Sequence, residues 1–349
     1  MIRPRADGAS AAPADLARWP ALVLTAGLAT RLQPLSTIRA KAALPVAGET
    51  LVLRILRWLH GAGVRRVVLN LHHRADSITR IVGDGSRAGF HPTAQSPRGG
   101  DPGLSVRYSW ETEVLGSAGG PARAIPLLES DRFLIVNGDT LTDVDLGALA
   151  SQHIDTNAMV TMAVVDADPR YNAIIANEAG IVTGFSKREP GTPPNPAPGT
   201  LEPWNNGTGR FHFIGIQAVN AAVFAGVSPD AKSETVHGIY PSFIASRKDS
   251  IRVFRTTKEF FDIGSPRDYL QTALTLARRE SRPVDRGRDC VVAADAIVRN
   301  TVLWDRVTVG AGAHLNHCVV ADDVTVPAGA RHADCSLVMR GREMIVAPF

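Results

Sequence analysis

Hydrophobic and polar positions along residues 20–280 follow two alternating periods. Short runs of apolar and β-branched residues at 21–24, 64–69, 106–110, 133–136, 159–165 and 211–219 predict buried strands. Stretches with helical spacing lie between them, as where Leu51, Ile55 and Leu59 recur every fourth residue within 50–61. Strands and helices that alternate at these distances imply βαβ units. We therefore expect an α/β domain, a three-layer sandwich around a mainly parallel sheet.

After residue 280 the hydrophobic period changes to six. Val291, Ile297, Leu303, Val309 and Leu315 follow one another at six-residue intervals. A hexapeptide repeat of aliphatic residues is typical of a parallel β-helix, in which each hexad forms one side of a triangular coil. So short a segment gives only two or three coils. We expect it to pack on the α/β domain or on another subunit.

Three segments follow neither period. Residues 1–19 are rich in Ala, Pro, Arg and Asp and lack the apolar stretch of a secretory signal, so we expect a disordered tail. Pro, Gly, Ser and Thr crowd residues 91–103 and 189–203, which predicts loops. The second loop is either a flap beside a site or a surface insertion. The expected domains are therefore 20–280 and 281–349, after the tail.

Composition excludes several classes of protein. The 349 residues are 44% hydrophobic and 21% charged, and no apolar run approaches the roughly 20 residues of a membrane span. The net charge is only +4 and the arginines are scattered, which disfavours a nucleic-acid partner. Three widely separated cysteines suggest neither a disulfide framework nor a metal site, and they fit a reducing cytoplasm.

The segment LTAGLATRLQPL at 24–35 is the first with candidate chemistry. It places a loop of small residues directly after the first strand, at the sheet edge where ligands bind in α/β proteins. Backbone N–H groups of Ala26, Gly27 and Thr30 can approach phosphate oxygens there. The guanidinium group of Arg31 can bind phosphate through two parallel hydrogen bonds, and Lys41 brings a second cation. This pattern predicts a phosphate-binding site.

A second candidate follows the strand at 133–136, which runs into Asn-Gly-Asp. Asp139 thereby stands at the carboxyl end of a buried strand. Mg²⁺ prefers oxygen ligands and usually retains water and substrate phosphates, so this carboxylate suits it. An aspartate in such a place can also be a turn former or a helix cap. Both interpretations stay open on the sequence.

Together with RAKAALPV at 39–46, the first loop resembles a known signature, roughly GGxGTRLxPLTxxxPKxLxPV. It belongs to the sugar-1-phosphate nucleotidylyltransferases, which include bacterial mannose-1-phosphate guanylyltransferases and N-acetylmuramate-1-phosphate uridylyltransferases. The resemblance covers about residues 20–275 and implies a Rossmann-like mixed sheet, with a left-handed β-helix in some members. Ala29 stands where the family usually has Gly, and Ala40 replaces a Pro. If position 29 needs a positive φ, its Cβ tightens the phosphate loop.

The resemblance extends to the nucleotide side of the site. ETEVLGSAGG at 111–120 is similar to the family's LGTAGA segment, in which Gly116 would lie against the nucleobase. Glu111 falls where the family often has a side chain that reads the base. The alternative is that Ser-Ala-Gly-Gly is a helix start packed tightly on the sheet.

The resemblance also implies metal ligands. In the family, the aspartate that matches Asp139 binds the metal. FDIGSP at 261–266 is similar to the family's W-x-DIGTP-x-x-Y pattern, which makes Asp262 a second metal ligand and is completed by Tyr269. A turn or capping role for Asp262 stays the alternative.

On the sugar side, FSKREP at 185–190 partly resembles the family's FxEKP. The resemblance implies that Lys187 or Arg188 binds the sugar phosphate and that Glu189 binds sugar hydroxyls. The order of these residues differs from the family's, so the choice between the two cations stays open. Gly215 lies in a segment that looks like the family's sugar-pocket strand.

These observations predict an Mg²⁺-dependent sugar-1-phosphate nucleotidylyltransferase. Its substrates would be a nucleoside triphosphate and a sugar 1-phosphate, and a homo-oligomer could form through the β-helix. Catalysis would consist mainly of positioning and charge neutralisation, with Arg31 and Lys41 as catalytic residues. Alternatives are an inactive regulatory subunit of the same fold and an acyl transferase in the β-helix. A dinucleotide oxidoreductase is disfavoured because the first loop lacks GxGxxG.

Overall fold

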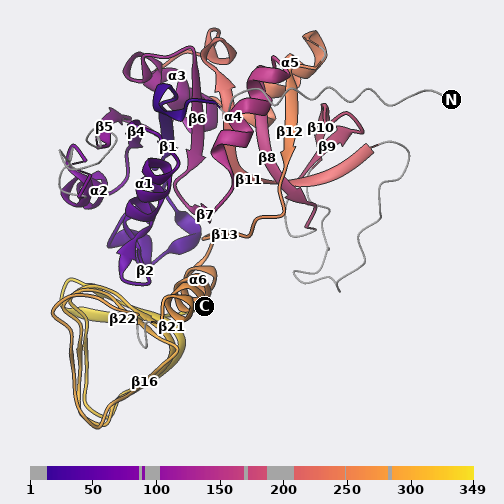
Figure 1. The fold of residues 1–349 in the computed structure, drawn as a ribbon. Helices are drawn as coiled ribbons and strands as arrows, with labels where there is room; N and C mark the ends of the chain where they lie inside the picture. The colour runs from indigo at the N-terminus through magenta and orange to yellow at the C-terminus, as the bar shows by residue number, and fades with distance from the viewer. Residues whose placement is uncertain are drawn as a thin grey trace, which may run out of the picture.

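The structure, a computed structural model, describes residues 14–85, 89–90, 103–168, 172–186, 208–247, 249–281 and 285–349. Figure 1 shows an α/β domain above a triangular coil of short strands, with helix α6 (Pro266–Arg279) between them. The expected Pro-rich segment 189–203 and most of 91–103 lie outside the described residues.

A nine-stranded mixed sheet forms the centre of the α/β domain. Its main path is β10 (Val182–Ser186), β9 (Ala173–Asn177), β11 (Thr208–Asn220), β6 (Arg132–Asn137), β1 (Ala21–Leu24), β4 (Arg66–Leu71) and β5 (Ser105–Trp110). β8 (Val160–Asp166) also pairs with β11, and it pairs with β12 (Ile251–Arg255). The strands β6, β1, β4 and β5 are parallel, whereas β11 runs antiparallel to its neighbours. This confirms the predicted mixed sheet.

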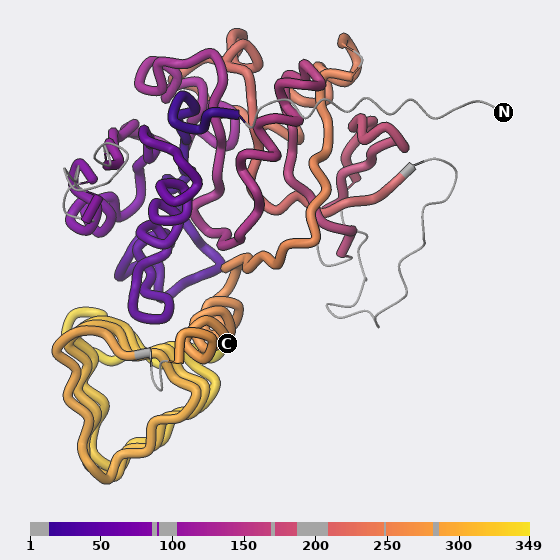
Figure 2. Tube along the Cα trace, in the orientation of Figure 1, coloured from indigo at the N-terminus to yellow at the C-terminus, as the bar shows by residue number. Residues whose placement is uncertain are grey.

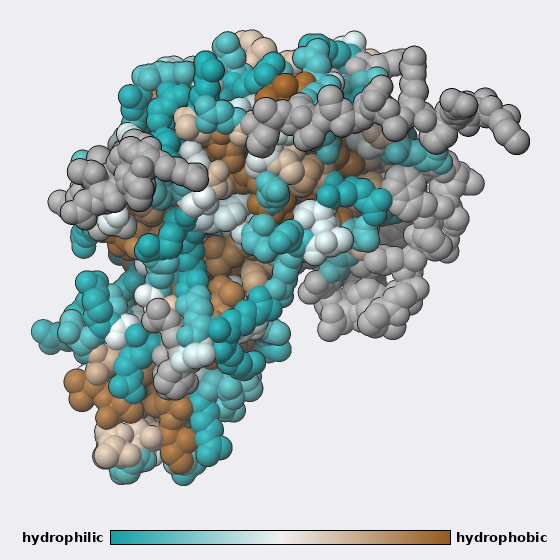
Figure 3. Space-filling model, viewed as in Figure 1, coloured by the Kyte–Doolittle hydropathy of each residue, from teal (hydrophilic) through white to brown (hydrophobic). Residues whose placement is uncertain are grey.

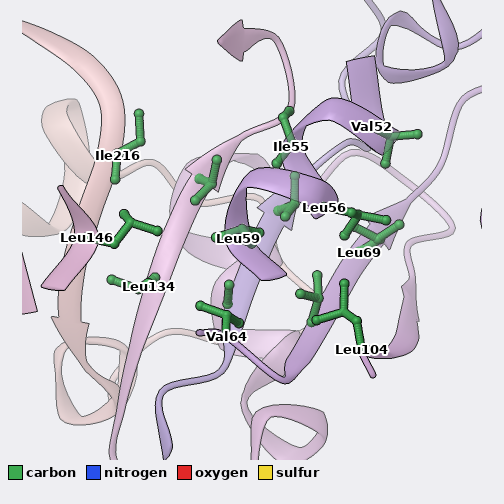
Figure 4. Close-up of a cluster of buried hydrophobic side chains, with 14 of the residues drawn as sticks. Val52, Ile55, Leu56, Leu59, Val64, Leu69, Leu104, Leu134, Leu146 and Ile216 are labelled. Carbon is green, nitrogen blue, oxygen red and sulfur yellow. The ribbon is translucent and has the colours of Figure 1, made fainter. Parts of the chain in front are cut away.

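Helices cover both faces of the sheet, so the three-layer prediction is confirmed. The described helices of this domain are α1 (Leu51–Gly61), α2 (Ala75–Val82), α3 (Gly116–Leu128), α4 (Leu146–Asp155) and α5 (Tyr240–Ser246). Alternate residues of β1 enter different cores: Val23 packs with α1, α2 and α4, while Leu22 packs with α3 and α5. Figure 4 shows the first core, to which α1 contributes Ile55 and Leu59, and in which Leu134 of β6 lies near Leu146 of α4.

The N-terminal segment differs from the sequence-based expectation. Residues 14–19 are ordered, with a single 3₁₀ turn at Leu16–Arg18. Leu16 and Trp19 are each only 6% exposed, and the Trp19 ring packs edge-on against His153. The disordered tail was therefore wrong for these six residues, because two large apolar side chains anchor them to the core. Residues 1–13 lie outside the described residues.

The C-terminal strands stack in parallel into a β-helix, whose triangular coil is clearest in Figure 2. They are β14 (Asp285–Arg286), β15 (Val291–Val292), β16 (Ile297–Arg299), β17 (Val302–Leu303), β18 (Thr308–Val309), β19 (His314–Val320), β20 (Thr325–Val326), β21 (Arg331–Arg340) and β22 (Glu343–Pro348). The last strand, β22, turns back antiparallel to β21.

The coil repeats every 17 residues rather than every 18. Val292 pairs with Val309, and Val298 pairs with Leu315. Three hexads make 18 residues, so the inferred register slips by one in the first coil. Val291 is accordingly 63% exposed and Ile297 38% exposed, although both belong to the six-residue aliphatic repeat. Later members of the repeat, including Val309, are buried as expected.

The β-helix packs against the sequence that carries the first motif. One hydrophobic core joins Leu32, Leu35 and Leu44 of the α/β domain to Tyr269 of α6 and Trp304 of the β-helix. All five side chains are fully buried. The β-helix is thus continuous in packing with the segment between residues 32 and 44. Within the described part of the chain, no helix is long and apolar enough to cross a membrane.

Candidate active site

Asn70 anchors the loop that follows β1. Its Oδ1 accepts the backbone N–H of Thr25 at 2.6 Å and that of Ala26 at 3.3 Å. The Thr25 hydroxyl in turn donates to the Asn70 carbonyl. Beyond this anchor the loop opens: no described atom comes within 4 Å of the place that a Cβ on Gly27 would occupy. The predicted phosphate-binding loop is therefore fixed at Thr25 and Ala26 and uncrowded at Gly27.

Ala29 adopts a left-handed conformation, with φ +49° and ψ +44°. It immediately precedes the 3₁₀ turn Thr30–Leu32, which carries Arg31. Position 29 therefore does require positive φ, which is the condition under which the Cβ of an alanine tightens this loop. An L-residue other than glycine is strained there by about 1 kcal/mol.

Lys41 and Asp139 form an ion pair. The Lys41 Nζ lies 2.6 Å from Asp139 Oδ2, and the two side chains are 15% and 30% exposed. Lys41 begins the 3₁₀ turn Lys41–Ala43, while Asp139 lies between β6 and β7 (Thr140–Thr142). Two residues predicted from separate motifs therefore meet at the carboxyl edge of the sheet.

A short antiparallel pairing brings Asp262 to the same place. β13 (Phe260–Asp262) pairs with β7, so that Asp262 lies opposite Thr140. The Ile263 N–H donates to the Asp139 carbonyl at 3.1 Å. The two predicted metal-binding aspartates, far apart in sequence, are thereby held close together, one just before β7 and the other at the end of β13.

The electrostatics of Asp262 reflect this grouping. Burial raises the pKa of Asp262, and the Asp139 charge raises it further, while Lys41 and Arg31 oppose the shift. Arg31 also lies beside the next turn, since its Nη1 is 3.3 Å from where a Cβ on Gly264 would be. All four predicted charged residues thus interact electrostatically at one site. Two neighbouring carboxylates that raise a pKa favour a bound cation.

The carboxylates of Asp139 and Asp262 are the candidate ligands for Mg²⁺. Across the described ranges, no three His, Cys, Asp or Glu side chains gather as a metal cluster. Asp139 and Asp262 supply two carboxylates. Mg²⁺ is commonly held by one or two carboxylates together with substrate phosphates and water, so a two-aspartate site suits it.

Glu111 connects the phosphate loop to the start of α3. Its carboxylate is buried, with Oε1 accepting from Asn70 Nδ2 at 2.8 Å and Oε2 accepting from the Leu115 N–H at 2.9 Å. Both oxygens are therefore engaged within the protein, which gives Glu111 a positioning role. Its predicted contact with the nucleotide stays a prediction. Asn70 was not among the predicted site residues; in the sequence it is a polar residue near the end of an apolar strand.

Gly116 is glycine for a reason that the sequence did not disclose. Its φ is +79°, and a Cβ would stand 2.6 Å from the Ser233 carbonyl oxygen and 2.7 Å from Glu234 Oε1. Glu234 Oε2 also accepts the Ser117 N–H at 3.3 Å and the Ser117 hydroxyl at 2.7 Å, so this carboxylate caps α3. The tight helix start left open as an alternative is therefore present. Contact with a nucleobase at Gly116 stays a prediction.

Gly215 lies in β11, beside the end of β6. It has φ +80°, and a Cβ there would come within 2.9 Å of the Asn137 side chain. Gly215 is thus close in space to the strand end that carries Asp139. Lys187, Arg188 and Glu189 lie outside the described residues, so their predicted roles stay predictions.

Comparisons with known proteins identify the family of the chain. The family model described as nucleotidyl transferase matches residues 20–279. A mannose-1-phosphate guanylyltransferase of Mycobacterium tuberculosis is 26% identical over 302 residues, covering 84% of this chain and 76% of that protein. An N-acetylmuramate alpha-1-phosphate uridylyltransferase of Neisseria meningitidis is 37% identical over 129 residues, covering 37% of this chain and 50% of that protein.

Among solved structures, HddC from Yersinia pseudotuberculosis has a similar fold. The TM-score is 0.55 at 21% identity, and the match covers 74% of this chain and 99% of that one. HddC has also been solved in complex with GMP-PN.

Proposed function

The chain belongs to the nucleotidyl transferase family, and from this premise we propose that it is a sugar-1-phosphate nucleotidylyltransferase. It would convert a nucleoside triphosphate and a sugar 1-phosphate into a nucleoside-diphosphate sugar and pyrophosphate. The observation that carries the proposal is the convergence of Arg31, Lys41, Asp139 and Asp262 at one edge of the sheet. The relatives named above act on mannose 1-phosphate and N-acetylmuramate 1-phosphate, which supports a sugar phosphate as acceptor.

The reaction needs charge neutralisation more than proton transfer. An oxygen of the sugar phosphate is already anionic, so it can attack the α-phosphorus without a strong base. The bond between the α-phosphorus and the oxygen that bridges it to the β-phosphorus breaks, and pyrophosphate leaves with that electron pair. Arg31 and Lys41 would neutralise the triphosphate and its leaving group, as positioned cations do in phosphoryl transfer generally.

The remaining residues bind and orient the substrates. Backbone N–H groups at Gly27 and Thr30, with the anchored Ala26, would line the triphosphate, and Gly116 with Glu111 would lie on the base side. Lys187 or Arg188 would bind the sugar phosphate, Glu189 the sugar hydroxyls, and Gly215 would form part of the sugar pocket.

Asp139 and Asp262 would hold Mg²⁺, which when bound supplies positive charge to the phosphate oxygens. The fit rests on two neighbouring carboxylates, since the pairing of β13 with β7 sets Asp262 opposite Thr140, the residue after Asp139. Burial and the charge of Asp139 raise the pKa of Asp262.

The test is pyrophosphate release with Mg²⁺ across a grid of nucleoside triphosphates and sugar 1-phosphates. We expect one pair of substrates to dominate and chelation by EDTA to abolish release. Asp139→Ala serves as the inactive variant. Asp143→Ala is its matched control, because Asp143 lies four residues away with a side chain 68% exposed. A blank grid from folded protein that still binds nucleotide would instead support the regulatory-subunit alternative.

Assembly and location are further parts of the proposal. Hydrophobic residues are exposed on the face of the β-helix seen in Figure 3, and Val291 and Ile297 of the first coil are among the exposed apolar side chains. This supports a homo-oligomer that forms through the β-helix. Light scattering of Val291→Lys beside wild type tests it, and an unchanged mass would reject this contact. Three free thiols fit a cytoplasmic location.

A further inference from the structure

Trp304 of the β-helix is linked through Tyr269 to the backbone that follows the turn carrying Lys41. It is fully buried and follows β17 directly. Its indole Nε1–H donates to the Tyr269 hydroxyl at 2.9 Å, and that hydroxyl donates to the Pro45 carbonyl. Pro45 stands four residues after Lys41. A chain of two hydrogen bonds therefore joins the β-helix to the backbone just beyond the catalytic turn.

Arg39 makes the connection on the other side. Its Nε donates to Asp322 Oδ2 at 2.7 Å and its Nη2 to Asp322 Oδ1 at 2.6 Å, a bidentate pair. The same Nη2 donates to Asp305 Oδ2 at 2.8 Å. The guanidinium carbon lies 5.3 Å from the centroid of the Trp304 ring. Arg39 stands two residues before Lys41.

The segment 39–45 is thus held at both ends, and both attachments meet at Trp304. Between them lies the turn Lys41–Ala43, whose Lys41 reaches Asp139. The Ala40 N–H is additionally held by Ser77 Oγ of α2 at 3.0 Å. Since the β-helix supplies Asp305, Asp322 and Trp304, its position fixes the backbone from which Lys41 extends.

We propose that the β-helix is a positioning element of the active site. Through Arg39 and Pro45 it clamps the Lys41 turn, so that the Lys41 ammonium is held where the triphosphate binds. This inference rests on the proposed function. Arg39, Asp322 and Trp304 are then positioning residues that touch no substrate. A displacement of about 1 Å at a catalytic group can lower turnover on the order of 100-fold, which is the scale of the expected effect.

The structure offers a matched pair of variants. Asp322→Asn removes one charge from the clamp and keeps the shape of the side chain. Asp323→Asn removes the same charge one residue later, from a pair with Arg306 at 2.6 and 2.8 Å. Both members of that second pair are at least half exposed, and neither contacts the α/β domain through it. Arg39→Lys, which keeps the charge but loses the bidentate geometry, is a second clamp variant.

Steady-state kinetics of these variants separate positioning from simple docking. We expect Asp322→Asn and Arg39→Lys to lower kcat by about 10- to 100-fold, with the KM for the sugar 1-phosphate unchanged within about twofold. Asp323→Asn should match wild type. Equal kcat for Asp322→Asn, Asp323→Asn and wild type would overturn the proposal and leave the clamp as an interface only.

A double-mutant cycle asks whether the clamp acts through Lys41. In a Lys41→Met background, Asp322→Asn should change kcat by less than about twofold, because the group that it positions is gone. Rate losses that multiply in the double variant would mean that the β-helix acts by another route, against the proposal.

Amide hydrogen exchange gives a readout that needs no activity. We expect amides of residues 40–45 to exchange faster in Asp322→Asn than in Asp323→Asn, with the central sheet unchanged in both. If exchange in this segment is equal in the two variants, the clamp does not exist. If wild type releases no pyrophosphate for any substrate pair, the proposed function fails, while exchange still decides whether the β-helix holds this turn.

Discussion

Two clusters of opposite charge lie next to each other in this protein and are organised differently. At the sheet edge, Lys41 and Asp139 share one hydrogen bond, and Asp262 lies beside them. Two residues away in the chain, Arg39 makes three hydrogen bonds to Asp322 and Asp305. Both clusters pair a basic side chain with aspartates. The first cluster keeps bonding capacity for a ligand, and the second uses its capacity within the protein.

The pKa values of one aspartate from each cluster, Asp262 and Asp305, are shifted in opposite directions. Burial raises the pKa of Asp262, and the neighbouring Asp139 charge adds to that. Burial also works to raise the pKa of Asp305, but the Arg288 N–H and the charge of Arg39 hold it below its ordinary value. Burial alone therefore does not distinguish a site from a structural ion pair. The two are distinguished by the hydrogen bonds and the positive charge that surround each carboxylate.

The largest expected effect is at the open cluster. Asp139→Ala should lower pyrophosphate release by at least about 10³-fold, since it removes a carboxylate from the proposed cation site and the partner of Lys41. Thermal unfolding should change little, because only one partly exposed ion pair is lost. Activity near that of the Asp143→Ala control would show that the open cluster is not the metal site.

The closed cluster should respond in stability. Arg39→Met leaves Asp322 and Asp305 without their main partner in a buried setting, so unfolding should become easier by about 3 kcal/mol in urea titrations. Arg306→Met is the control, because the Arg306–Asp323 pair is exposed and should contribute at most about 1 kcal/mol. If the two variants lose the same unfolding free energy, burial does not make the ion pairs of Arg39 more stabilising than that of Arg306.

The sequence predicted the open cluster better than the closed one. Each of Arg31, Lys41, Asp139 and Asp262 sits in a local motif that could be read by itself, and the parallel strands imply a common edge. The bonds of Arg39 span 266 and 283 residues. No local pattern marks such partners, because Arg39 in the sequence looks like any solvated arginine. The same holds for Glu234, which meets Ser117 across 117 residues.

The slip in the β-helix register has a similar cause. Val291 and Val292 are adjacent and equally apolar, as are Ile297 and Val298. Hydrophobicity therefore cannot tell which member of each pair points inward. A coil of 17 residues differs from three hexads by a single position, and only the pairing of Val292 with Val309 reveals it. The architecture could be predicted from the period, whereas the register required the contacts.

Asp262 offers a test of how the open cluster depends on pH. Its folded-state pKa is raised, so the protonated form is favoured by folding, and stability from this group is lost as pH rises through the folded pKa. Asp262→Asn should therefore raise the melting temperature at neutral pH without Mg²⁺. The gain should shrink as the pH is lowered into the range where the wild-type carboxyl is protonated. A gain that is constant with pH would contradict a charge-based origin. Turnover should fall at every pH.

The smallest effect expected is at Ala29, where the phosphate loop carries backbone strain. Ala29→Gly relieves a left-handed alanine and should stabilise the protein by about 1 kcal/mol, less what glycine adds to the entropy of the unfolded chain. The chain contains a matched control in Ala47, which has the same φ of +49° in the turn between the short strands Pro45–Val46 and Glu49–Thr50.

Ala47→Gly should therefore give a similar shift in urea midpoint, because the positive φ that it relieves is the same. The two variants should differ in kinetics, since only position 29 precedes Arg31 in the loop that would hold the triphosphate. We expect a lower KM for the nucleotide in Ala29→Gly and no change in Ala47→Gly. If both variants gain stability alike and neither alters the KM, strain at Ala29 is a general backbone cost. The conformation of this loop would then make no contribution to nucleotide binding at the open cluster.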